Sequence, residues 1–278
     1  MAADLESFAK AACELLDSRG VRDIDGYGWL NLEEMDPDFS GYVMWVQVPP
    51  YDHDFMNWQR NIPPERAPTK EEQALMELGH DFFGFMKTAR HFIGHALLYQ
   101  PQTPPKEIDP TEFDFSEFAA LTALVAAADR LRDFVIMALL GKNTRKWRAL
   151  LEESYRQLKV MGFDVLVTEL RAGFCGTERA RTARNIVVHR LATKPARVQR
   201  KLIARDRVAF EAQSWGKPAR GTYGEQVAGW QRRINSAVAK IERRAKLLCD
   251  TYSVLAKLGE VSIRAEYYVR QRRSTTSG

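Results

Sequence analysis

The stretch from Phe118 to Leu140 constrains the fold most, because it is the most apolar run of the chain and is rich in alanine and leucine. Charged residues interrupt it at Asp129, Arg130, Arg132 and Asp133. A membrane-spanning helix needs a run of about 18 or more apolar residues, and no such run occurs in the sequence. The stretch therefore predicts a helix in a packed core and argues against a membrane span.

Most of the remaining chain also has helical spacing of its apolar residues. The pattern predicts helices over residues 3–18, 70–99, 114–140, 147–160, 164–174, 177–192 and 225–260, with a further apolar stretch to Val269. Helix starts are predicted at Thr69, at Asp114 or Ser116, and at Thr177, which are residue types that cap helices. Helix ends and breaks are predicted at Gly20, Gly141, Gly162, Gly176 and Pro195.

Residues 20–70 differ from the rest, since Gly, Pro, Asp and aromatic residues dominate and Tyr42–Val48 has the composition of a strand. The fold class expected is thus mainly α, a helical bundle with an N-terminal region that contains a few short strands. Prolines between 101 and 110 mark a boundary. We predict an N-terminal helical and irregular region over 1–110, without an assigned role, and a helical domain over 111–278 with a disordered tail from Arg270.

Positive charge is concentrated in the second half. The chain carries 41 Lys and Arg against 36 Asp and Glu, but the first third is acidic to neutral and the last hundred residues hold most of the excess arginine. Such asymmetry favours a phosphate-bearing partner, and the other interpretation is a set of solvated helix faces. A segment that we call the basic arm could follow an RNA backbone: Arg190, Lys194, Arg197, Arg200, Lys201 and Arg205.

The motif Arg-Asn-Ile-Val-Val-His occupies residues 184–189 in a predicted helix. The guanidinium of Arg184 could bind a phosphate through two hydrogen bonds, and the imidazole of His189 could transfer protons near neutral pH. Asn185 lies four residues before His189 and therefore on the same helical face, whereas Arg184 lies about 100° round the helix from Asn185. The other interpretation is an ordinary surface arginine and a half-buried histidine.

Other histidines favour a structural interpretation. Arg90 and His95 repeat the Arg-x4-His spacing, but they lie in an aromatic-rich segment without basic neighbours, which indicates core or interface. His80, His91 and His95 lie near one helical face, yet no acidic or cysteine ligand follows at metal-site spacing. Phosphate-binding glycine loops are also missing from the sequence. We therefore expect neither a metal nor a cofactor.

The motif at residues 184–189, which follows an Ala/Leu-rich helix containing Asp-Arg-Leu-Arg-Asp-Phe, resembles the HEPN superfamily over about residues 112–270. Members are all-α bundles, and many are metal-independent endoribonucleases of defence and toxin–antitoxin systems. They typically act as dimers whose Arg-x4–6-His motifs face each other. The resemblance implies catalytic roles for Arg184, Asn185 and His189, and an acidic residue, Asp129 or Asp133, that orients the arginine.

Two functions follow as expectations. The first is a HEPN-like endoribonuclease that binds RNA as a homodimer, with an antitoxin or another defence-system protein as a further partner. The second is a HEPN-like module that binds RNA or protein without cleaving it, and a purely structural helical protein is a third possibility. Three scattered cysteines, Cys13, Cys175 and Cys249, suit a reducing compartment, and the first residues lack the apolar stretch of a signal peptide, so we expect a cytoplasmic location.

Overall fold

A computed structural model of the chain describes residues 2–22, 24, 70–98, 110–141, 146–193 and 222–276. The helices are α1 (Ala2–Ser18), α4 (Lys70–Leu98), α5 (Pro110–Leu140), α6 (Trp147–Val160), α7 (Asp164–Thr193) and α9 (Thr222–Thr276). No strand occurs within these ranges. The prediction of a mainly α protein is confirmed, whereas the predicted strand at Tyr42–Val48 lies outside the described residues.

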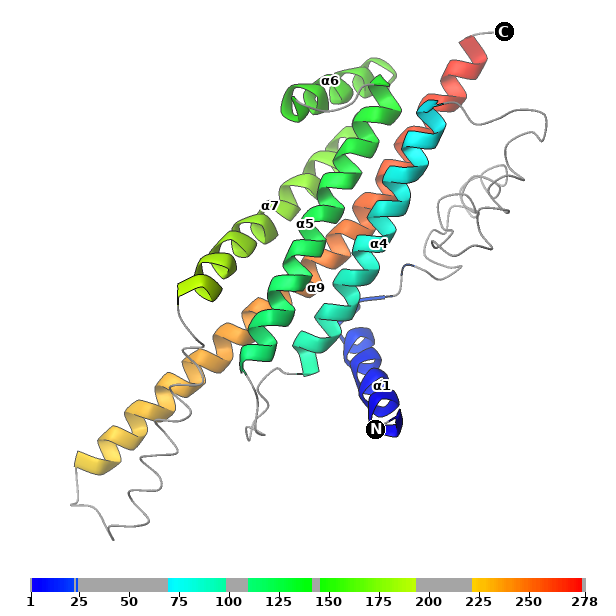
Figure 1. The fold of residues 1–278 in the computed structure, drawn as a ribbon. Coiled ribbons are helices and arrows are strands. Elements are labelled where there is room, and N and C mark those ends of the chain that lie inside the picture. The colour runs from blue at the N-terminus through cyan, green and yellow to red at the C-terminus, as the bar shows by residue number, and fades with distance from the viewer. Residues whose placement is uncertain are drawn as a thin grey trace.

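Helix α5 runs through the middle of the bundle (Figure 1). It packs against α4 along most of its length and also contacts α7 and α9, while α1 packs on α4 and α6 lies near the end of α5. Helix α4 runs antiparallel to α5, since Asp81 lies beside Arg130 and Glu71 beside Gly141. Among the described residues, no helix is both long enough and apolar enough to cross a membrane.

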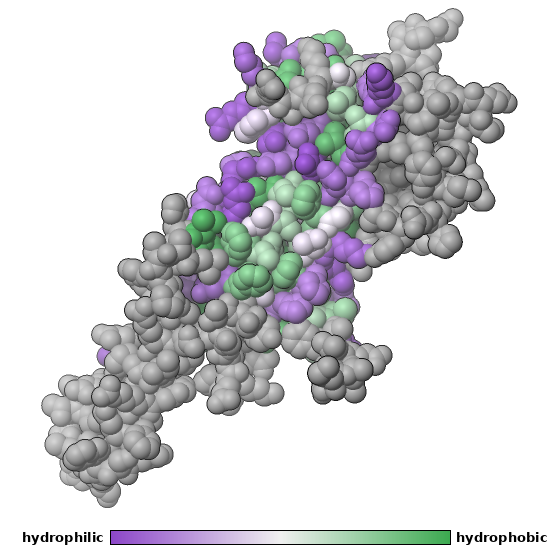
Figure 2. Space-filling view, in the orientation of Figure 1, coloured by the Kyte–Doolittle hydropathy of each residue, from purple (hydrophilic) through white to green (hydrophobic). Residues whose placement is uncertain are grey.

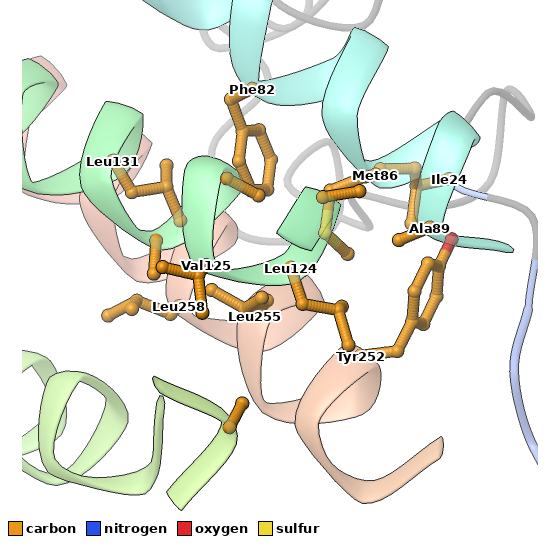
Figure 3. Close-up of a cluster of buried hydrophobic side chains, with 14 of the residues drawn as sticks. Ile24, Phe82, Met86, Ala89, Leu124, Val125, Leu131, Tyr252, Leu255 and Leu258 are labelled. Atoms are coloured by element: carbon orange, nitrogen blue, oxygen red, sulfur yellow. The ribbon is translucent and has the colours of Figure 1, made fainter. Parts of the chain in front are cut away.

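One cluster of buried apolar side chains joins the six helices of the described residues. Figure 3 shows part of it, where Phe82 and Met86 of α4, Leu124 of α5 and Tyr252 of α9 meet. The hydroxyl of Tyr252 donates to the carbonyl oxygen of Arg22 at 3.0 Å, which ties the segment after α1 to the core. Helices on both sides of the predicted boundary at residue 110 thus share one core, and the boundary itself stays a prediction.

Three predicted helix ends are confirmed. Gly20, Gly141 and Gly162 have φ angles of 70°, 61° and 87°. In this left-handed region a Cβ atom clashes with the backbone, so glycine is the residue that ends a helix there. The turn at Gly162 allows α7 to fold back after α6.

The predicted break at Gly176 is wrong, because α7 is one continuous helix from Asp164 to Thr193. A Cβ atom at Gly173 would lie 2.7 Å from Cδ1 of Leu258 in α9, and one at Gly176 would lie 3.1 Å from Cγ1 of Val254. These glycines allow α7 and α9 to approach closely. Thr177 is therefore not an N-cap, and its Oγ1 donates to the carbonyl oxygen of Phe174 inside the helix at 2.8 Å.

Two further helix limits differ from the sequence prediction. Helix α5 starts at Pro110, which suits a helix start because proline lacks the N–H that has no partner there, so neither Asp114 nor Ser116 is the N-cap. Helix α9 continues to Thr276, so the segment predicted as a disordered tail from Arg270 is helical. Its 55 residues correspond to a length of about 80 Å.

Candidate active site at the end of helix α7

The motif occupies the last turns of α7, which run without interruption to Thr193. Arg184 is half-buried and Asn185 is exposed, while His189 is placed by its backbone alone. Nη2 and Nε of Arg184 donate to Oδ1 of Asn185 at 3.1 and 3.4 Å. The arginine side chain therefore does bend towards its polar neighbour.

Helical geometry separates the arginine and histidine positions of the motif. Position 189 lies about 40° from Asn185 but about 140° from Arg184. Val187, which is 3% exposed, packs into the core and sets the inner face of this segment. Arg184 lies next to that inner face, and position 189 lies on the outer face with Asn185. Within one chain, the backbone thus directs the two positions to different sides of the helix.

Asp129 is one of the two candidates for the acid that orients Arg184, but it does not bind Arg184. Its Oδ1 accepts hydrogen bonds from Nη2 of Arg181 at 2.5 Å and from Nη1 of Arg132 at 2.9 Å. Asp133, the other alternative, lies 3.5 Å from Nη2 of Arg132. The acid that the resemblance implies is thus present on α5, but it contacts the arginine one turn before Arg184.

These contacts form a polar network across three helices. Arg132 of α5 also lies over the ring of Trp147 at the start of α6, with 4.4 Å between its guanidinium carbon and the ring centre. The hydrogen bond that Asp129 accepts raises the pKa of Arg181, and this effect outweighs the opposing effect of burial. Arg181 therefore keeps its charge at any physiological pH.

A second charged cluster joins the start of α5 to α9. Arg244 donates to the carboxylates of Asp114 and Glu117, and Glu117 is 2% exposed. Burial favours the neutral form of Arg244, but the hydrogen bonds and charges of Glu117 and Asp114 outweigh it and raise its pKa above the usual value. Arg244 is thus part of the structural framework.

Most of the basic arm lies outside the described residues, namely Lys194, Arg197, Arg200, Lys201 and Arg205, while Arg190 is placed by its backbone alone. Its proposed contact with RNA stays a prediction. Other basic side chains are exposed on α7 and on the N-terminal half of α9, at Arg179, Arg232, Lys240, Arg243 and Lys246.

The second Arg-x4-His copy is part of the packing between α1 and α4. Nη2 of Arg90 lies 3.9 Å from Oδ1 of Asp17, and both Arg90 and His95 are half-buried. The rings of His91 and His95 are 4.5 Å apart between centres. In the part of the chain that the structure describes, no group of three potential metal ligands occurs.

Apolar side chains are exposed within the motif and at the start of α5. Ile186 and Val188 are 46% and 42% exposed, and Phe115 at the start of α5 is 56% exposed. Figure 2 shows that apolar residues gather on the visible face of α5 and the neighbouring end of α7. On α5, residues that are exposed or half-buried recur at helical spacing, namely Phe115, Phe118, Ala119, Thr122 and Ala126. We call this surface the apolar face.

Comparisons with known proteins found nothing similar. No protein-family model matches the chain, and neither the curated proteins nor the solved structures contain a match.

Proposed function

We propose that the chain is a HEPN-like, metal-independent endoribonuclease of a bacterial defence or toxin–antitoxin type system, acting in the cytoplasm. The observation that carries this proposal is an undivided Arg-Asn-x3-His motif at the end of a long helix in an all-α bundle. The exposure of Asn185 and the outward position of residue 189 on the helix agree with a site that a large substrate reaches from solvent.

The residue types fit cleavage of RNA by its own 2′-hydroxyl. One group must remove the proton of this hydroxyl, another must protonate the leaving 5′-oxygen, and a cation must stabilise the extra charge on phosphorus. His189 suits proton transfer near neutral pH, and Arg184 suits the phosphate oxygens. Asn185, which already accepts hydrogen bonds from Arg184, would hold that guanidinium in place.

A homodimer would supply the second histidine that the chemistry needs. Within one chain Arg184 and position 189 lie on different sides of α7, so a second copy offers the simplest way to bring an arginine and a histidine together. The apolar face of α5, which includes the exposed Phe115, offers apolar area for such a contact, as do Ile186 and Val188, which lie on different sides of α7. We expect the protein to elute at about twice its mass of 31.8 kDa.

Cleavage of labelled total RNA in the presence of EDTA tests the proposal. His189→Ala should lower the rate by about 100- to 10,000-fold, because it removes a proton-transfer group, and Arg184→Ala should also abolish cleavage. Arg179→Ala is the matched control, since Arg179 is an exposed arginine of the same helix outside the motif. Activity that persists in both motif variants, or that EDTA removes, contradicts the proposal.

The alternative is a HEPN-like module that binds RNA or protein without cleaving it. If the protein is a monomer, the angle of about 140° between Arg184 and position 189 favours this alternative, because a chain that acts alone would not bring these groups to one phosphate. A protein that is monomeric at assay concentration, binds RNA and leaves it intact would establish this alternative.

A further inference from the structure

We propose that Arg181 is a second phosphate-binding residue, which holds a neighbouring phosphate of the same RNA strand at the edge of the contact between α7 and α5. The inference rests on the proposed function, since it assigns Arg181 to the strand that the motif would cleave. Asp129 is then a positioning residue that acts through Arg181.

The first support is the position of Arg181 on the helix. Residues 181, 185 and 189 are spaced four apart, so successive members are displaced by only about 40° around the axis and about 6 Å along it. Arg181, Asn185 and position 189 therefore form a stripe that turns by about 80° in total, from Arg181 at the contact with α5 to position 189 on the outer side. Arg181 lies about 80° around the helix from position 189, whereas Arg184 lies about 140° from it, so Arg181 is the arginine nearer to the outer side.

The second support is the way in which the guanidinium is held. Nη2 of Arg181 donates to Asp129, and Nε lies 3.5 Å from Oε1 of Glu178. These contacts with described residues use Nη2 and Nε, and the side chain is 30% exposed. Within the described part of the chain the guanidinium is thus held in one orientation with Nη1 outside these contacts, which suits binding of a phosphate oxygen.

The charges around Arg181 set the strength of the site. Asp129 accepts from two guanidiniums, of Arg181 and Arg132, so its charge is shared between them. Glu178 is exposed, lies beside Arg181 and competes with a phosphate for its donors. Removing the Glu178 charge should therefore strengthen RNA binding, an effect that a purely structural role of Arg181 does not produce.

The distance between Arg181 and position 189 decides which kinetic constant changes. Two helical turns separate them, about 12 Å, so Arg181 would bind a phosphate beside the cleaved bond and not the reacting phosphate. Arg181→Ala should raise KM about tenfold, as expected for loss of a charged hydrogen bond, while kcat stays within about twofold. The KM of Arg181→Lys, which keeps the charge without the planar donors, should lie between the KM of the wild type and that of Arg181→Ala. Glu178→Gln should lower KM about twofold.

The experiment measures cleavage kinetics together with affinity for a short single-stranded 2′-O-methyl RNA, which cannot be cleaved by its own 2′-oxygen. Arg264→Ala is the matched control, because Arg264 of α9 forms a half-buried ion pair with Glu169 of α7, 3.1 Å apart, away from the stripe. For Arg181→Ala we expect weaker binding and a log–log salt slope that is smaller by about 0.7, the value for one phosphate contact on a single strand.

The outcomes separate this inference from the proposed function. If Arg181→Ala binds the oligonucleotide like the wild type or like Arg264→Ala, or if Glu178→Gln does not tighten binding, the inference is wrong even when His189→Ala abolishes cleavage. If the binding pattern holds but the wild type cleaves no RNA, Arg181 binds phosphate and the nuclease proposal is wrong. If the wild type does not bind the oligonucleotide, both are wrong.

Discussion

Gly173→Ala should destabilise the protein although alanine is the best helix former. A Cβ atom at position 173 would lie 2.7 Å from Cδ1 and 3.3 Å from Cβ of Leu258, which is buried. An extra methyl group in a packed core costs about 1–3 kcal/mol, and alanine recovers about 1 kcal/mol of helix propensity. We expect a net loss of about 1 kcal/mol in the free energy of unfolding, which lowers Tm by about 2–4 °C for a chain of this size.

Gly176→Ala is the matched control for this prediction. Its Cβ atom would lie 3.1 Å from Cγ1 of the half-buried Val254 and no closer than 3.7 Å to any other atom. The helix propensity gained should balance this milder contact and leave Tm unchanged or higher.

Thermal and urea unfolding, followed by circular dichroism, measure both glycine variants. In Gly173→Ala/Leu258→Ala the clash is relieved, so the cost of the double change should be less than the sum of the single changes. The close-approach assignment is refuted if Gly173→Ala is as stable as Gly176→Ala, or if the two costs add.

Three further predictions concern charge and burial. Arg244→Ala should lower the free energy of unfolding by about 3–5 kcal/mol in urea titrations, because it leaves the buried Glu117 carboxylate without its cation; an unchanged midpoint would contradict this. Burial raises the pKa of Cys249 to about 11, so at neutral pH a thiol-alkylating reagent should modify the exposed Cys13 and Cys175 well before Cys249, and mass spectrometry of the modified peptides checks the order. The last variant replaces four residues of the basic arm by serine, namely Arg197, Arg200, Lys201 and Arg205. It should bind RNA of all sequences more weakly, and the log–log slope of affinity against salt should fall by about 0.7 per lost phosphate contact. An unchanged slope would assign the segment to a solvated face.

The sequence predicted the features that depend on neighbouring residues. Apolar spacing predicted the first and last residues of α6 correctly. Gly141 and Gly162 were also predictable as helix ends, because a helix end of this kind depends only on the local backbone conformation of the glycine. Gly173 and Gly176 follow a different rule, since their reason is a contact with α9, about 80 residues later in the chain. No local pattern distinguishes a glycine that ends a helix from one that admits another helix.

The candidate site was predictable in the same partial way. The motif spacing placed Asn185 and position 189 on one face, and the structure retains that helix. The arginine that binds Asp129 was not predictable from the sequence. Arg181 and Arg184 are one helical turn apart and both lie more than 50 residues after Asp129, so only the rotation of α7 against α5 selects Arg181. An arginine four residues before Asn185 was the available sign, and it becomes informative only when the contact of α7 with Asp129 of α5 is known.

The unbroken helix α9 also restricts how the chain can change in evolution. Arg244 in this helix binds α5 and Arg264 binds α7, so both contacts depend on the number of residues between them. One inserted or deleted residue would rotate one arginine against the other by about 100° and shift it by about 1.5 Å. Diverged copies of this gene should therefore tolerate substitutions between these arginines but keep their spacing, and length changes should accumulate outside the helices.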